Sequence, residues 1–170
     1  ERTRALTKSE KLLDAIFQSM GQGILLLDQE LEIVQANRMA SEMFGVPLEV
    51  LIGNGYQEIT DADGVRKLQE SSRSLKEGEI RDIEITGLYV DGDSFPCRVT
   101  VTVMHLEGQE MHPLIVRDIS REKEMEASIV EQKRQAEEMN VTLRNVLKSI
   151  EEEKKEFEEG LSTRIRSSLL

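Results

Sequence analysis

Residues 118–120, Asp118-Ile119-Ser120, mark the point at which the pattern of the sequence changes. Upstream of this segment, short apolar runs alternate with polar residues and are separated by glycines, as in a compact domain that contains β-strands. Downstream, apolar residues recur at steps of three and four among many charged residues, which is typical of one long amphipathic helix. Any signal that passes from the first part of the chain to the second must cross Asp118-Ile119-Ser120.

Five upstream segments have the short apolar run or the period-two alternation expected of β-strands. Asp91-Gly92-Asp93 is a strong hairpin turn between the third and the fourth, and Pro113 is tolerated where the last strand begins. Because each strand has one polar face, we expect an α+β fold with a five-stranded antiparallel sheet and helices on one face. The expected strands are residues 24–27, 33–36, 83–87, 95–103 and 114–116.

Helical segments flank and connect these strands. An amphipathic helix is expected at residues 1–20, where apolar residues recur at helical spacing before Gly21 ends it. Short helices are expected after Asn37 and after Pro47, and a longer one between residues 60 and 77. The expected organisation is therefore an N-terminal helix at 1–20, a globular domain at 21–120, a long helix at 121–159 and the start of a linker at 160–170.

The long helix carries an apolar seam whose steps alternate between three and four residues, the spacing of a coiled coil. Two copies paired in parallel would bury this seam, so we expect a homodimer. Gln132 and Glu153 fall within the seam and make the coil weaker and easier to shift, and Gly160 interrupts it. The alternative is a single solvated helix supported by pairs such as Glu151 with Lys155. The expected seam residues are Met125, Ile129, Ala136, Met139, Leu143, Val146, Ile150 and Phe157.

Charge and composition narrow the classes of function. The 170 residues include 22 Lys and Arg against 33 Asp and Glu, and the net charge of -11 argues against direct nucleic-acid binding by this segment. The single cysteine cannot form an internal disulfide, and no apolar run reaches the length of a membrane span. We therefore expect a cytoplasmic location and no membrane contact. The opening Glu1-Arg2-Thr3-Arg4 lacks a start methionine, so we expect a fragment of a longer protein.

Five motifs occur through residues 12–124 in a specific order and spacing. They are Gly23-Ile24-Leu25-Leu26-Leu27-Asp28, Asn37 with Ala40, Phe44 and Gly45, Glu49 through Gly53, Asp91-Gly92 with Phe95-Pro96, and Asp118-Ile119-Ser120. Together they resemble a PAS domain (PAS/PAC), the small sensor fold of bacterial and eukaryotic signalling proteins. The resemblance implies a five-stranded antiparallel sheet wrapped by helices around an interior that can hold a small ligand.

In the PAS family the last strand ends in Asp-Ile-Thr, and its two polar residues tie the sheet to the exit helix. Asp118, Ile119 and Ser120 occupy these places, and Ser120 keeps the hydroxyl while it loses a methyl group. The resemblance therefore implies a role in signal transmission for these three residues. Independently of any family, Asp and Ser at a strand-to-helix junction cap helix amides and fix the exit angle. A plain helix cap without a signalling role is the alternative.

An internal pocket of this fold would be lined by inward residues of the third helix and of the sheet. The same residues are needed to fill a solid core, which is the alternative. One small polar member of the set, Ser72, favours a pocket that holds a small-molecule ligand. The candidate pocket residues are Leu68, Ser72, Leu75, Ile85, Val101, Val103 and Ile115.

The sequence does not indicate which cofactor, if any, is bound. Light-oxygen-voltage members of the family carry a cysteine in an Asn-Cys-Arg motif, whereas Cys97 follows Pro96 on a strand, where packing is its expected role. Haem-binding members supply an axial histidine from the region of residues 60–77, which contains none. His105 and His112 are expected to be surface residues rather than metal ligands.

The leading hypothesis is a sensory, dimeric PAS module whose coiled coil relays a signal to an output domain. Residues 145–170 are similar to linkers that join PAS sensors to LuxR-type helix-turn-helix domains, which implies a transcriptional regulator. No catalytic constellation or phosphate loop is present, and no histidine follows His112 as a phosphoacceptor, so we expect no enzyme activity. The alternatives are the sensor segment of a histidine kinase or nucleotide cyclase, and a ligand-free dimerisation scaffold.

Overall fold

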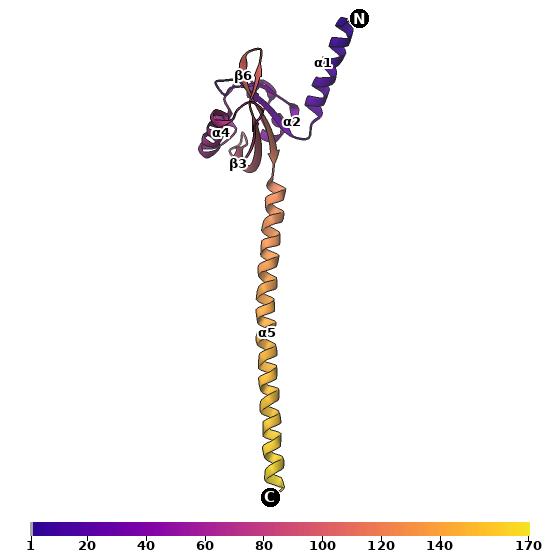
Figure 1. The fold of residues 1–170 in the computed structure, drawn as a ribbon, viewed down its shortest axis with the longest axis vertical. Helices are drawn as coiled ribbons and strands as arrows, with labels where there is room; N and C mark the ends of the chain where they lie inside the picture. The colour runs from indigo at the N-terminus through magenta and orange to yellow at the C-terminus, as the bar shows by residue number, and fades with distance from the viewer. Residues whose placement is uncertain (1) are drawn as a thin grey trace. The chain divides into compact units, whose positions relative to one another are not determined.

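The computed structural model of the chain describes residues 2–170, with side chains from residue 5 onward (Figure 1). The chain divides into two compact units, one that ends at Lys123 and one that comprises Glu124–Leu170. The first unit holds the β-strands and the shorter helices, and the second consists of most of the long helix α5 (Ser120–Ser168). Among the described residues, no helix is both long and apolar enough to span a lipid bilayer.

The first unit is built on an antiparallel sheet. Its strands are β1 (Gly23–Leu27), β2 (Ile33–Ala36), β3 (Ile80–Leu88), β4 (Ser94–Thr102), β5 (Met104–Leu106) and β6 (Gln109–Asp118). Five of these strands lie in the order β2-β1-β6-β4-β3, and the short β5 pairs with the start of β6. The α+β fold with a five-stranded antiparallel sheet is confirmed, while β5 and the first half of β6 are additions that the sequence pattern did not predict.

Pro113 lies inside β6 rather than at its start. It pairs with Leu26 of β1, whereas the pairing between β4 and β6 ends at Val101 and Leu114. Thr102 Oγ1 donates to the Pro113 carbonyl at 3.2 Å, so the backbone N and O of Pro113 point toward β4. At this position the residue pairing between β4 and β6 has already ended. The missing amide hydrogen therefore removes no ladder hydrogen bond.

The helices of the first unit are α1 (Arg2–Ser19), α2 (Arg38–Phe44), α3 (Leu48–Leu51), the 3-10 helix η1 (Tyr56–Glu58) and α4 (Ala62–Ser74). Asn37 caps α2 by accepting from the backbone N–H of Ala40, and Gly45 ends the helix with a φ of 67°. Asp61 caps α4 by accepting from the N–H of Gly64 at 2.8 Å. Helix α4 packs on β3 and β4, and α2 packs on β1.

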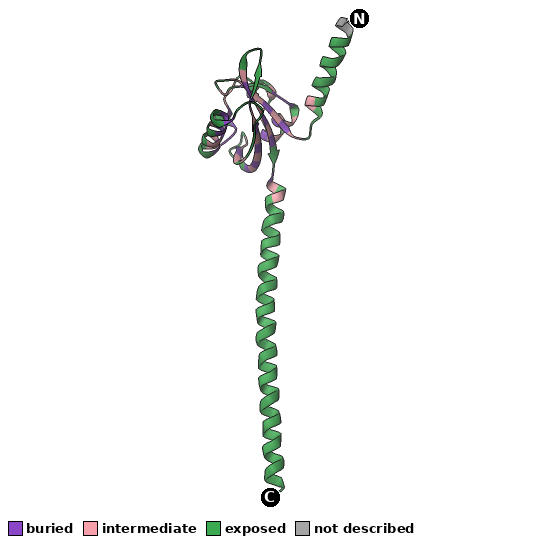
Figure 2. Ribbon diagram, viewed as in Figure 1, coloured by how far each residue is buried: buried purple, intermediate pink, exposed green. Residues whose placement is uncertain are grey.

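Alternate strand residues and the inner sides of the helices form one core, drawn in purple in Figure 2. Within it, Phe95 lies against two aromatic rings, with centroid distances of 5.7 Å to Phe44 and 4.7 Å to Tyr89. Gly87 pairs with Phe95 across the sheet, and a Cβ atom at Gly87 would lie 2.6 Å from Phe95 Cζ. A side chain at position 87 is therefore incompatible with this packing.

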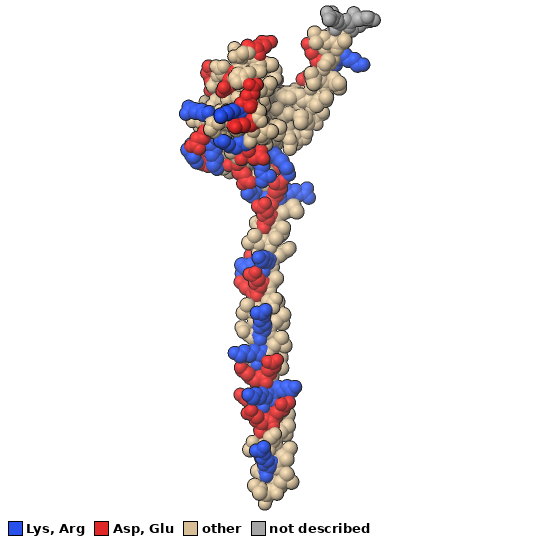
Figure 3. Space-filling model, viewed as in Figure 1, with Lys and Arg blue, Asp and Glu red and all other residues tan. Residues whose placement is uncertain are grey.

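Helix α5 continues without a break through Gly160 to Ser168, beyond the end at residue 159 that the sequence predicts. At about 1.5 Å per residue, its 49 residues extend about 70 Å. Every residue from Glu124 onward is exposed (Figure 2), and acidic and basic side chains are distributed along the helix (Figure 3). The large seam side chains belong to this exposed surface, from Val146 at 49% to Phe157 at 67% exposed.

Candidate functional site

Asp118, Ile119 and Ser120 join the last strand to α5 through backbone and side-chain contacts. Asp118 Oδ1 accepts hydrogen bonds from the backbone N–H of Ser120 at 2.8 Å and from its hydroxyl at 2.6 Å. Ile119 is fully buried, and its N–H donates to the Pro96 carbonyl while its own carbonyl accepts from Lys123 N. Asp118 therefore satisfies a free amide of the first helical turn, and Ile119 anchors that turn in the domain.

Charged side chains surround the same junction and form a junction cluster of Glu84, Arg98, Arg117, Glu122 and Lys123. Glu84 of β3 pairs with Lys123 at 2.8 Å and with Arg98 of β4 at 3.0 Å. Glu122 pairs with Arg98 at 3.5 Å and with Arg117 at the end of β6. Hydrogen bonds from Lys123 and then from Arg98 lower the pKa of Glu84. Exposed pairs stabilise little individually, but this network joins three strands to the first turn of α5.

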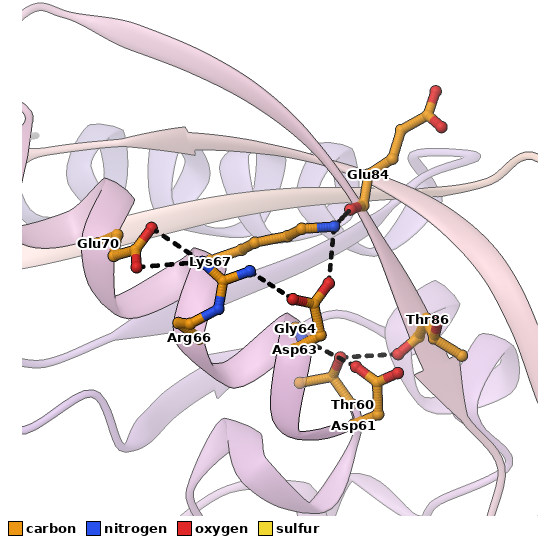
Figure 4. Close-up of polar contacts among 9 residues, drawn as sticks. All are labelled: Thr60, Asp61, Asp63, Gly64, Arg66, Lys67, Glu70, Glu84 and Thr86. Atoms are coloured by element: carbon orange, nitrogen blue, oxygen red, sulfur yellow. Dashed lines mark hydrogen bonds and ion pairs between the residues drawn. The ribbon is translucent and has the colours of Figure 1, made fainter.

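Helix α4 is fastened to β3 beside the junction cluster (Figure 4). Lys67 Nζ donates to the Glu84 carbonyl at 3.0 Å and pairs with Asp63 at 2.8 Å. Thr60 Oγ1 donates to the Thr86 carbonyl at 2.7 Å. The side chain of Glu84 points away from Lys67 in Figure 4. Glu84 therefore contacts α4 through its backbone and α5 through its carboxylate.

Most residues that the sequence assigns to an internal pocket are packed in the core. Leu68, Leu75, Val101 and Val103 belong to the core cluster, and Ile85 packs against it partly buried. Side chains are buried in this way both in a solid core and around an enclosed cavity, so a ligand pocket lined by these residues stays a prediction.

Two expectations about β6 need correction, and both have the same cause. Ile115 is half-buried and lies outside the core, whereas its neighbours Leu114 and Val116 are each 1% exposed and belong to it. Because side chains alternate along a strand, the register that turns Leu114 and Val116 inward also turns His112 inward. His112 is 2% exposed, so its predicted surface position is wrong.

A polar pocket of about 360 Å³ lies beside His112, between α4, η1, β6 and the β1–β2 turn. His112 Nε2 lies 3.2 Å from Glu110 Oε1, and burial lowers the pKa of His112 although the Glu110 carboxylate raises it. Ser72, the polar member of the predicted pocket set, also lines this space. By contrast, His105 is exposed, with Nδ1 3.2 Å from Glu77. Residues that line the polar pocket include Tyr56, Gln69, Ser72, Arg73, Glu110 and His112.

Two further kinds of reactive group are metal ligands and the thiol of Cys97. Within the part of the chain that the structure describes, no three His, Cys, Asp or Glu side chains are placed to hold a metal ion. Cys97 is buried on β4, where it pairs with Asp118 of β6. Burial, and then the Asp118 carboxylate, raise the pKa of Cys97 to about 12, so the thiol stays protonated at neutral pH and acts as a small packing residue.

Comparison with known proteins places the globular unit in one family. The family model described as the PAS fold matches residues 11–119. An uncharacterized protein of Azorhizobium caulinodans is 31% identical over 118 residues, which are 66% of this chain and 16% of that protein. The chain therefore spans about a sixth of the length of that relative.

Solved PAS domains from sensor kinases and regulators have the same fold. A PAS domain of an HTR-like protein from Haloarcula marismortui has a TM-score of 0.65 at 23% identity and covers 69% of this chain and 98% of its own. A PAS domain from a two-component sensor histidine kinase has a TM-score of 0.58 at 12% identity, with 66% and 97% covered. A PAS domain of a LuxR-family transcriptional regulator from Burkholderia thailandensis, solved in complex with ethanol, has a TM-score of 0.54 at 17% identity, with 62% and 96% covered. With its family match and its fold in agreement, this chain belongs to the PAS family of sensory domains.

Proposed function

We propose that this chain is the sensory module of a dimeric signalling protein, in which two α5 helices pair in parallel and relay a change in the PAS domain to an output domain, a transcriptional regulator. The observation that carries the proposal is the attachment of α5 to the sheet. Asp118 accepts from both polar hydrogens of Ser120, and Ile119 is buried in the domain. A displacement of the sheet at this point is therefore passed to the first turn of α5.

The exposed seam of α5 supports the pairing of two copies. Its apolar side chains repeat at coiled-coil spacing, and the least exposed of the large ones, Val146, is still 49% exposed. A parallel partner would remove this surface from water, which contributes about 25 cal/mol per Å² buried. Ion pairs within the helix, such as Arg134 with Glu131 at 2.7 Å, lie at outer positions of the repeat and leave the seam free.

A relay also requires two arrangements of the coil that are close in free energy. Gln132 and Glu153 interrupt the apolar seam, and polar residues at such positions lower the stability of a coiled coil. These two positions are the places where a small bias from the PAS domain shifts the pairing most easily.

A regulator, a histidine kinase and a nucleotide cyclase would share this module and differ in the output domain. The similarity of residues 145–170 to linkers that precede LuxR-type domains favours the regulator. In the full-length protein, a helix-turn-helix pattern after position 170 would support this choice, and a catalytic signature would support a kinase or cyclase. The polar pocket beside His112 favours a sensor over a ligand-free dimerisation scaffold.

Disulfide cross-linking tests the parallel dimer. In a C97V background, the variants M125C and I150C each place one thiol on the seam, far apart along α5. A parallel coil in register cross-links both variants with themselves under mild oxidation. An antiparallel coil places opposite ends of the seam side by side, so neither variant cross-links with itself. K148C, at an outer position of the repeat, is the matched control. A monomer in sedimentation velocity at micromolar concentration would contradict the proposal.

A further inference from the structure

Between Leu143 and Leu161, helix α5 carries two overlapping seams that have one series of residues in common. Coiled-coil positions recur every seven residues, and a seam combines two such series that lie three and four residues apart. The shared series is Leu143, Ile150 and Phe157. The first series follows it by three residues and consists of Val146, Glu153 and Gly160. The second series follows it by four residues and consists of Leu147, Lys154 and Leu161.

The part of α5 ahead of Leu143 fits the first series. Met125 and Met139 continue this series toward the N-terminus, whereas Glu126 and Asn140 occupy the corresponding places of the second series. Polar side chains in a seam lower the stability of a coiled coil. The upstream part of α5 therefore favours pairing through the first series.

The part of α5 after Phe157 fits the second series. The helix continues without a break through Gly160, which offers no side chain to a seam, while Leu161 and Ile165 are exposed. The steps from Phe157 to Leu161 and from Leu161 to Ile165 are both of four residues. Two consecutive steps of four change the alternation as an inserted stutter does, and they locally unwind the coil. Pairing beyond Phe157 therefore favours the second series.

The segment between these two parts, residues 143–157, fits either series. Val146 is 49% exposed and Leu147 is 59% exposed, so both are available to a partner helix. Glu153 and Lys154 are neighbours, and each places one charge in its own seam. Whichever of these two lies in the seam is flanked by the opposite charge of the other helix, which offsets part of the cost. The two registers are therefore close in free energy over this segment.

We propose that residues 143–157 pair with the same residues of a second copy through either series, so that the α5 dimer contains a movable stutter. A parallel second copy is the partner that fits, because in both registers it presents the shared series opposite itself and places Glu153 beside Lys154. Exchange of one series for the other rotates each helix by about 50°, the angle between positions three residues apart at 3.5 residues per turn. This inference rests on the proposed dimeric relay and identifies its two arrangements.

Disulfide cross-linking in the C97V background tests the two seams. V146C reports pairing through the first series and L147C reports pairing through the second. I150C belongs to the shared series and reports the dimer itself. We expect V146C and L147C to cross-link with themselves at rates within about threefold of each other, because the two registers are close in free energy.

Two substitutions shift the balance in opposite directions. E153L removes the charge from the first series and K154L removes it from the second, while leucine preserves the helix. E153L should raise the ratio of the V146C rate to the L147C rate at least about tenfold, and K154L should lower it by a similar factor, because each favours one register only. E152L makes the same change as E153L at a position outside both seams and should leave the ratio unchanged.

Beyond Phe157, L161C should cross-link at least about tenfold faster than G160C, because position 161 lies in the second seam. Faster cross-linking of G160C overturns the proposal, as does a ratio that neither E153L nor K154L changes. If I150C cross-links with itself in the same experiments, the parallel dimer stands and only the two-seam arrangement fails. If I150C does not cross-link with itself, the proposed dimer and the two-seam arrangement both fail.

Discussion

Lys123 Nζ lies 2.8 Å from Glu84 Oε2, so the first turn of α5 is ion-paired with the edge strand β3. Glu84 also accepts from Arg98 of β4, and its carbonyl accepts from Lys67 of α4. One residue of β3 therefore contacts a neighbouring strand, a helix of the domain and the exit helix. Glu84 is thus the residue at which α4, β4 and the first turn of α5 meet.

The first prediction concerns this contact. E84Q weakens the pairs with Lys123 and Arg98, so the first turn of α5 opens more often while the core is unchanged. Hydrogen–deuterium exchange should become faster at the Lys123 amide, which bonds to the Ile119 carbonyl, with little shift in the midpoint of urea unfolding. E70Q, which weakens an exposed pair with Arg66, is the control. Equal exchange in both variants would show that Glu84 does not hold the helix start.

The second prediction concerns the cap of α5. D118A removes the acceptor of the Ser120 N–H and should lower the free energy of unfolding by about 1 kcal/mol, the usual contribution of a helix cap. D118N keeps a capping oxygen and should be nearly neutral. S120A loses only the hydroxyl contact and should fall between them. Urea titrations of the three variants measure the order, and a destabilised D118N would mean that charge, rather than capping, is responsible.

The third prediction compares Ile119, the buried residue that directly follows β6, with Ile115, a half-buried residue of this strand. I119V trims a fully buried side chain and should cost about 0.5–1.5 kcal/mol of unfolding free energy. I115V makes the same chemical change at a half-buried position outside the core, so its cost should be smaller. The two variants are matched in size and chemistry. A larger loss for I115V would contradict the complete burial of Ile119 and the partial exposure of Ile115.

The fourth prediction concerns pH. Burial lowers the pKa of His112 in the folded chain, although Glu110 on β6 and Asp28 in the β1–β2 turn raise it. The unfolded chain therefore binds the proton more tightly, and stability falls as the pH drops below the unfolded value of about 6.5. The free energy of unfolding should decrease between pH 7 and the folded pKa, and H112Q should flatten this decrease. H105Q controls for the loss of an exposed histidine. If H112Q leaves the pH dependence of the free energy of unfolding unchanged, groups other than His112 cause the decrease.

Local signals in the sequence were sufficient to predict the order of the helices and strands. Asn37 and Gly45 begin and end α2 as their types predict, because capping and a positive φ depend on the immediate backbone. The Asp91-Gly92 turn joins β3 to β4, with Gly92 at a φ of 90°. The end of α5 was predicted too early, since Gly160 lowers helix propensity without being sufficient to end a long helix.

The candidate site was predictable only in part. Asp118 and Ser120 are neighbours in sequence, so their contact follows from residue types alone. Glu84, Arg98 and Lys123 resemble other surface charges of the chain, and nothing in their spacing distinguishes them. Their contact depends on the antiparallel pairing of β3 with β4 and of β4 with β6, which brings distant residues to one edge of the domain.

By itself, the sequence determined the PAS fold, the strand-to-helix junction and the apolar repeat of α5, because turns, caps and periodicity are properties of neighbouring residues. Only the tertiary structure decided which face of β6 is inward. Apolar residues occur on both faces of this strand, with Leu114 and Val116 on one and Ile115 on the other, so its alternation fits either register. Pairing with β1 and β4 turned Leu114, Val116 and His112 inward, and that choice created the polar pocket.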